Sequence, residues 1–170
     1  NASECMVLVE LLNTLRLSRI ALHARTGKQQ YKGHPDLEAF QGFYELCQHP
    51  LYYNGGIESL SDIRQILIRF PLLKGVFMGR GLLSSPLLAK EFKGNETFLP
   101  EQRMSIYFAF HEELFSAYSQ VLQGETQLLV KMKTLWEYFL PETDRKLLKR
   151  IKKSTRLQQY TESVKAIFTS

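Results

Sequence analysis

The fold is decided by a stretch in which two short apolar runs each break off into glycines. Residues 51–57 read LYYNGGI, and residues 75–81 read GVFMGRG. Between them, apolar side chains recur at helical spacing up to Phe70, after a cap at Ser59 or Ser61. The stretch therefore predicts strand, glycine turn, helix, strand and glycine turn, which is a parallel βαβ unit.

The glycines after both strands indicate a phosphate-binding site. In parallel α/β folds, ligands bind at the carboxyl ends of the strands. Gly55, Gly56 and Gly79 leave backbone N–H groups uncovered, and the Arg80 guanidinium can fork onto a phosphate. Residues 84–86 are expected to open a further helix, whose N-terminus favours an anion. One glycine cluster is equally well explained as a tight turn, but two on consecutive strands, one with an arginine, favour binding.

The rest of the first 92 residues repeats the alternation of helix and strand. A strand is predicted over 18–23, and helices over 2–15, 35–48 and 85–92. A parallel barrel closes with eight strands, whereas three leave two bare edges. The pattern therefore predicts the C-terminal three strand–helix units of a TIM (β/α)8 barrel, an α/β fold. The face toward the missing strands is expected to carry Leu22, Tyr53 and Val76.

From Pro100 onward the strand pattern disappears. Helices are expected over 101–123, 125–140, 144–153 and 155–168, with Thr143 or Asp144 capping the third and Ser154 or Thr155 the fourth. The short connections between them predict an antiparallel helical bundle. We therefore predict two domains, a partial barrel over 1–95 and an all-α domain over 96–170. The aromatic side chains of the second domain are expected to form its core rather than platforms on which bases stack.

Composition limits the classes of protein. The chain has 170 residues, of which 44% are hydrophobic and 23% charged, as in a soluble globular protein with a sizeable core. Cys5 and Cys47 lack the spacing of metal ligands or of a disulfide framework, so we expect buried free thiols and no metal site. No apolar run reaches membrane-spanning length and no signal peptide is visible, so a cytoplasmic location without membrane contact is expected.

The formal net charge of +5 is unevenly distributed. From Arg145 to Arg156 there are seven basic residues and no acidic one. Such a run predicts a polyanionic partner. The alternative explanation is a basic helix face that is merely solvated.

A third motif lies in the polar loop after the first strand, where residues 23–33 read HARTGKQQYKG. A lone histidine at the end of a strand is more often structural than functional. Followed by NGGI at 54–57 and MGRG at 78–81, however, this loop completes a set of three motifs. In order and spacing they resemble the tRNA-dihydrouridine synthase family. The resemblance covers essentially the whole chain but only the C-terminal part of that family's proteins.

The resemblance implies a flavin enzyme in which FMN, reduced by NADPH, passes a hydride to the C5=C6 bond of a uracil base in tRNA, while a cysteine donates the proton. The residues implied to bind the cofactor are His23, Asn54, Gly55, Gly56, Gly79 and Arg80. Those implied to face the substrate are Arg25 and Tyr31. Those implied to bind tRNA are Arg145, Lys146, Lys149, Arg150, Lys152, Lys153 and Arg156.

The chain also departs from the family pattern. It lacks the Asn-x-Gly-Cys-Pro motif that carries the catalytic cysteine and the lysine that lies under the flavin, and neither Cys5 nor Cys47 has that context. We therefore predict that the chain alone is inactive, binds FMN weakly and self-associates through open sheet edges. Two alternatives stay open: another FMN- or phosphate-binding barrel oxidoreductase, and a non-catalytic RNA-binding module.

Overall fold

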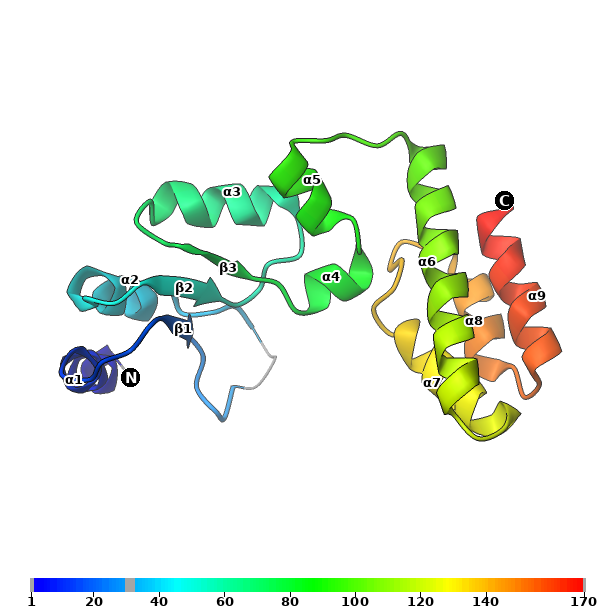
Figure 1. Ribbon diagram of the computed structural model, residues 1–170, viewed down its shortest axis with the longest axis horizontal. Helices are drawn as coiled ribbons and strands as arrows, with labels where there is room; N and C mark the ends of the chain where they lie inside the picture. The colour runs from blue at the N-terminus through cyan, green and yellow to red at the C-terminus, as the bar shows by residue number, and fades with distance from the viewer. Residues whose placement is uncertain (1, 30–32, 170) are drawn as a thin grey trace. The chain divides into compact units, whose positions relative to one another are not determined.

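The computed structural model describes residues 2–29 and 33–169 (Figure 1). Its contacts divide the chain into two compact units, residues 1–82 and 83–170. This boundary lies earlier than the predicted domain boundary at residue 95, because the segment after residue 82 packs with the helical unit. The division of function between the two domains stays a prediction.

A parallel sheet forms the centre of the first unit. Its strands are β1 (Ile20–His23), β2 (Leu51–Asn54) and β3 (Gly75–Phe77), in the order β1-β2-β3. Ile20 lies opposite Leu51, and Tyr52 lies opposite Gly75. This register puts His23, Asn54 and Phe77 in one row at the carboxyl edge. The parallel βαβ arrangement predicted from the sequence is confirmed.

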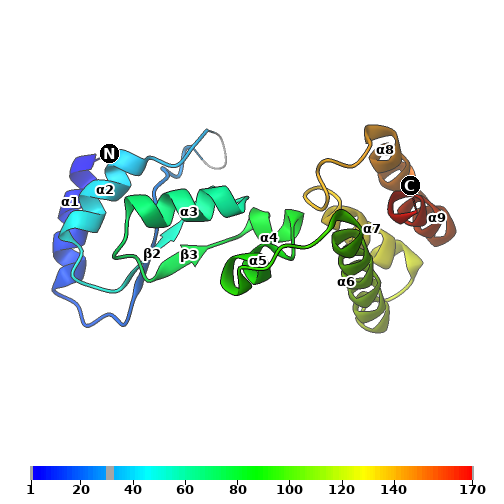
Figure 2. The same cartoon turned by 90° about the horizontal axis from the view of Figure 1, so that it is seen from above.

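Three helices accompany the sheet: α1 (Ala2–Asn13), α2 (Leu37–Leu46) and α3 (Leu60–Arg69). Figure 2 shows α1 alongside α2. The Asp36 carboxylate caps α2 by accepting a hydrogen bond from the Ala39 backbone N–H at 2.9 Å. At the start of α3, Ser59 and Asp62 form a reciprocal capping box. Of the two candidate serines, Ser59 is therefore the cap.

Helices α2 and α3 pack on the same face of the sheet. The Tyr53 ring, 2% exposed, meets the Phe40 ring of α2 edge-on at 4.9 Å, and Phe40 meets Phe70 at the end of α3 at the same distance. The row containing Tyr53 therefore faces the helices, and the prediction that it faces missing strands is wrong. The opposite face carries Tyr52 and the 47% exposed Phe77. Both faces carry aromatic side chains, so the alternation of side chains does not reveal which one faces the helices.

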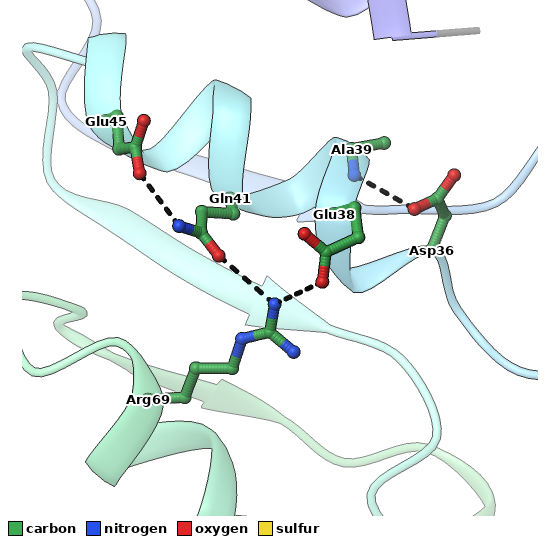
Figure 3. Close-up of polar contacts among 6 residues, drawn as sticks. All are labelled: Asp36, Glu38, Ala39, Gln41, Glu45 and Arg69. Atoms are coloured by element: carbon green, nitrogen blue, oxygen red, sulfur yellow. Dashed lines mark hydrogen bonds and ion pairs between the residues drawn. The ribbon is translucent and has the colours of Figure 1, made fainter.

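A surface network also joins α2 to α3 (Figure 3). The Arg69 Nη2 atom of α3 donates to Glu38 Oε1 at 2.6 Å and to Gln41 Oε1 at 3.1 Å. Gln41 in turn donates to Glu45 at 2.9 Å. An exposed ion pair of this kind contributes about 0–1 kcal/mol, so the buried aromatic contacts hold the two helices more firmly.

Two short helices follow β3 where one helix over 85–92 was predicted. Helix α4 (Arg80–Ser84) begins directly after Gly79, and α5 (Leu88–Gly94) follows. The predicted start at the serines is wrong, because Leu87 stands at the N-cap of α5 and makes no side-chain capping bond. Asn95, with a left-handed φ of 49°, follows the last residue of α5.

The second unit is built mainly from four helices: α6 (Pro100–Val121), α7 (Glu125–Leu135), α8 (Arg145–Lys153) and α9 (Leu157–Phe168). Asp144 caps α8 as predicted, whereas the predicted cap of α9 at Ser154 or Thr155 is wrong, because Arg156 stands at its N-cap and makes no side-chain capping bond. Helix α7 ends before residue 140, where Leu140 has a φ of 48°. The aromatic residues predicted for the core are mostly there. Tyr107, Trp136 and Phe139 are buried, Phe110, Phe115 and Tyr118 pack partly buried against them, Phe108 contacts Phe168, and Tyr138 is exposed.

A buried polar chain crosses the core of the second unit. The Trp136 Nε1–H group donates to the Tyr160 hydroxyl at 2.9 Å, and that hydroxyl lies 2.7 Å from His111 Nε2. His111 Nδ1 lies 3.0 Å from a Glu112 carboxylate oxygen. Neutral His111 with its proton on Nδ1 satisfies every group, because Tyr160 then donates to Nε2. Burial lowers the pKa of His111 and raises that of Tyr160.

No helix within the described ranges combines the length and the apolar character needed to cross a bilayer.

Candidate phosphate-binding cleft and basic helix

The ends of the strands bring the predicted motifs together at one edge of the sheet. His23 and Asn54 are register partners, and Arg80 follows β3 after a short turn. Partial desolvation at the sheet edge is the first cause that lowers the pKa of His23, although the residue is exposed, and the positive charges of Arg25 and Arg80 lower it further. Both guanidinium groups therefore act on the same imidazole and favour its neutral form.

The turn after β2 requires glycine at two positions. Gly55 has a φ of 149° and Gly56 a φ of 61°, which side chains other than glycine rarely adopt. A Cβ atom on Gly55 would lie 3.0 Å from Pro35 Cγ and 3.3 Å from His23 Cδ2. The turn is thus held tightly between the loop before α2 and the histidine.

The two glycines around Arg80 have different roles. A Cβ atom on Gly81 would clash with the carbonyl oxygen of Ile57 and lie 3.0 Å from the Cα atom of Glu58. Gly81 therefore lets the first turn of α4 pack directly on the loop after β2. A Cβ atom on Gly79 would meet nothing within 4 Å. The backbone at Gly79 consequently borders open space that a ligand group can enter.

A cleft of about 640 Å³ opens at this edge. Gly55, Gly56 and Arg80 line it, together with Arg25 and Glu58. His23 instead lines a neighbouring cleft of about 360 Å³, which shares Arg25 with the first. Asn54 and Gly79 are not among the residues that line either cleft. The structure thus brings the glycine turn and both arginines to one cleft and places His23 beside it.

Polar contacts position the arginines of the cleft. Arg80 forms an ion pair with Glu58 at 3.3 Å, and Arg25 donates to the carbonyl of Gly33 at 2.8 Å. Sequence reasoning missed Glu58, although an acidic residue directly after the NGGI motif signals a possible partner for Arg80. Tyr31, predicted on the substrate side, lies outside the described residues.

The seven basic residues of the predicted tRNA-binding run are all exposed. Six of them lie on α8, and Arg156 lies at the N-cap of α9. On the other side of α8, Ile151 is buried in the core and Leu147 and Leu148 pack against it. The run is therefore the solvent face of an amphipathic helix, as both the binding hypothesis and the solvated-face hypothesis require.

Neither cysteine lines the cleft at the glycine turn or lies on α8, whereas Cys5 lines the neighbouring cleft that holds His23. Both are free thiols, and both are half-buried rather than buried as expected. Within the described part of the chain, no group of three or more histidine, cysteine, aspartate or glutamate side chains is arranged to hold a metal ion.

A parallel strand–helix repeat with glycine turns and an arginine at the carboxyl edge is the arrangement found in many α/β proteins that bind phosphate groups. Comparison of the sequence with known families specifies this further. The family model described as dihydrouridine synthase (Dus) matches residues 2–169, and the chain belongs to this family. The resemblance drawn from the three motifs is thereby confirmed.

Two curated relatives match shorter segments. The chain is 34% identical over 86 residues to a probable tRNA-dihydrouridine synthase of Aquifex aeolicus (strain VF5), covering 51% of the chain and 27% of the relative. It is 34% identical over 67 residues to a probable tRNA-dihydrouridine synthase of Rhizobium leguminosarum bv. phaseoli, covering 39% of the chain and 21% of the relative. The matched part is thus 27% and 21% of the length of these relatives.

Proposed function

We propose that this chain supplies the flavin-phosphate end of the catalytic domain and the tRNA-binding helical domain of a tRNA-dihydrouridine synthase. This enzyme is an oxidoreductase that reduces uridine in tRNA to dihydrouridine. The observation that carries the proposal is the convergence of His23, the glycine turn after β2 and Arg80 at one edge of the sheet. Because the chain belongs to the dihydrouridine synthase family, we propose that the ligand bound at this edge is the phosphate of a flavin.

The sheet supports a place in a TIM barrel. Its strand order follows the sequence without a reversal, whereas a doubly wound sheet reverses its order at a switch point. Helices α2 and α3 both cover the face of Tyr53, while the other face is exposed at His23 and Phe77. Helices on one side and an open face on the other are what three consecutive units of a barrel present. We infer that the open face is the interior of the barrel.

The residues present fit the phosphate of FMN. The turn at Gly55 and Gly56 and the open space beside Gly79 let backbone N–H groups approach an anion, and Arg80 and Arg25 bring positive charge. His23 and Asn54, on the open face, would contact the flavin, with His23 acting as a neutral hydrogen-bonding partner. When bound, FMN supplies hydride transfer, with NADPH as the reductant.

Substrate binding is assigned to both units. Arg25 lies at the cleft and is proposed to face the uridine. The basic face of α8 is proposed to hold the phosphates of tRNA, and the enzyme is expected in the cytoplasm, where its substrate is found. The sequence holds no Asn-x-Gly-Cys-Pro motif to supply the proton-donating cysteine. We therefore infer that the 170-residue chain does not catalyse the reaction by itself.

The test is dihydrouridine formation in unmodified tRNA by the protein expressed from its full coding sequence, with FMN and NADPH. Arg80→Ala is expected to weaken FMN binding about 10- to 100-fold, since a charge-assisted hydrogen bond contributes about 1.5–3 kcal/mol. Arg64→Ala, on the exposed side of α3, is the matched control and should leave FMN binding unchanged.

A second candidate is a non-catalytic RNA-binding module, which the missing cysteine motif favours. A colourless full-length protein that binds tRNA and leaves its uridines unreduced would establish this candidate instead. A yellow protein that reduces another substrate, and not tRNA, would establish the alternative of a different FMN-dependent barrel enzyme.

A further inference from the structure

The cleft at the glycine turn is larger than a phosphate group needs. Its volume is about 640 Å³, and pockets that enclose a whole drug-sized ligand measure about 300–1,000 Å³. A phosphate held by Gly55, Gly56 and Arg80 would therefore fill only part of the cleft. The side chains that line the remaining part decide which groups can follow that phosphate.

The remaining part of the cleft runs along one face of α3. The residues of α3 that line it are Asp62, Gln65, Ile66 and Arg69. The last three follow the first by three, four and seven positions, so all four share one side of the helix and span about 10 Å of its axis. Tyr53 also lines the cleft, and its ring lies on the face of the sheet that α2 and α3 cover. The cleft therefore leads toward the helix-covered side of the sheet, away from the open face on which the flavin ring is placed.

Glu58 stands where the cleft passes from the sheet edge to α3. Its carboxylate lies 3.3 Å from the Arg80 guanidinium, and its side chain is partly exposed. Its backbone is held from two sides. The Glu58 N–H group donates to the Asp62 carboxylate at 3.0 Å, and a Cβ atom on Gly81 would lie only 3.0 Å from the Glu58 Cα atom. The side chain can thus rotate, but its point of attachment stays beside Arg80.

Two other charged side chains of the cleft are engaged by the protein itself. The Asp62 Oδ2 atom accepts hydrogen bonds from the backbone N–H groups of Glu58 and Ser59 at 3.0 and 2.8 Å, as part of the helix cap. At the far end of the cleft, Arg69 pairs with Glu38 at 2.6 Å (Figure 3). Glu58, by contrast, directs its carboxylate to the arginine that is proposed to bind the phosphate. A negative group that follows this phosphate along α3 would therefore meet the Glu58 carboxylate.

We propose that Glu58 is a specificity-determining residue, which lets the cleft accept a flavin that ends in a phosphate monoester, FMN, and disfavours one extended by a second phosphate, FAD. The proposal rests on the proposed function, from which it takes the flavin. The terminal phosphate of FMN displaces Glu58 from Arg80, and the exposed carboxylate turns toward solvent. The second phosphate of FAD would bring a further negative charge beside that carboxylate. A like charge placed against the wrong ligand is a common means of discrimination.

The test compares the affinities of the full-length protein, freed of flavin, for FMN and FAD, followed by the quenching of flavin fluorescence. The unaltered protein should bind FMN at least about tenfold more tightly than FAD. Glu58→Gln keeps the size of the side chain and removes its charge. This variant should gain several-fold in affinity for FMN and about tenfold more than that for FAD, so the preference for FMN should fall about tenfold. Glu45→Gln, an exposed residue of α2 that does not line the cleft, is the matched control and should keep the preference.

Riboflavin, which lacks the phosphate, shows whether Glu58 acts at the phosphate or elsewhere on the flavin. Its affinity should be the same for the unaltered protein and for Glu58→Gln. An equal gain for riboflavin and FMN, an unchanged preference for FMN in the variant, or equal binding of FMN and FAD by the unaltered protein would each overturn the role of Glu58 and leave the proposed function standing. Absence of binding of any flavin by the unaltered full-length protein would overturn both.

Discussion

Substitution of the two glycines that flank Arg80 gives a sharp test of how the cleft is built. In Gly81→Ala, the added methyl group would clash with the Ile57 carbonyl oxygen and lie 3.1 Å from its carbonyl carbon. These are backbone atoms, which cannot rotate away. Alanine improves helix propensity by about 1 kcal/mol over glycine, but inserting a methyl group into a packed site costs about 1–3 kcal/mol. Because the obstruction is backbone, the cost should lie at the upper end of this range, about 2–3 kcal/mol, which leaves a net loss of about 1–2 kcal/mol.

The matched control is Gly79→Ala, two residues earlier. Its methyl group would meet nothing within 4 Å, so the free energy of unfolding should change by less than about 0.5 kcal/mol. Thermal unfolding followed by circular dichroism measures both variants. A loss of 1–2 kcal/mol lowers the melting temperature of a domain of this size by about 5–15 °C. A Gly81→Ala protein that melts as high as the Gly79→Ala protein would refute the close packing of α4 on the loop.

Three further outcomes are expected. Because the pKa of His111 is lowered in the folded protein, the free energy of unfolding should be highest above the unfolded-state pKa of 6.5 and should fall as the pH drops below it. In His111→Gln this fall should be smaller, as measured by urea unfolding at pH values above and below 6.5. Glu58→Gln removes the carboxylate that pairs with Arg80 and should raise the FMN affinity of the full-length protein several-fold; weaker binding in a flavin titration would count against the phosphate cleft. The 170-residue chain should self-associate at micromolar concentration through its open sheet. Phe77→Ser, on the open face of the sheet, should therefore reduce the sedimentation coefficient. Leu72→Ser, which changes an exposed residue outside the sheet, should leave it unchanged.

Local signals in the sequence were sufficient at several helix starts and at one turn. The capping box at the start of α3 links residues three positions apart, and the Asp36 and Asp144 caps use side chains next to the helices they begin. The pair Gly55 and Gly56 indicates the turn after β2 in the same way, and both residues have a positive φ in the structure. The parallel sheet and the convergence of the motifs follow from these signals, because parallel strands place all their carboxyl ends at one edge.

Features that depend on distant contacts could not be read in the same way. Helix α4 begins at Arg80 without a capping signal, and the residue that allows it to pack there, Gly81, is explained only by the Ile57 carbonyl. The inward face of β2 was misassigned because each of its faces carries a tyrosine, and only the contact between Tyr53 and Phe40 decides between them. The pairing of Glu58 with Arg80 and the continuation of the cleft along α3 likewise become visible only when separate elements are brought together.

The order of the strands has a consequence for how the chain acquires its structure. Each strand pairs with the strand that precedes it in the sequence, and α1 contacts α2 and α8 contacts α9 in the same sequential manner. Contacts between segments close in sequence form quickly, because the loops that must close are short. During synthesis, β2 can therefore dock on β1 once both α2 and β2 have left the ribosome, and β3 can add to β2 next. Within this three-stranded sheet, the strands can therefore be assembled in the order in which they are translated.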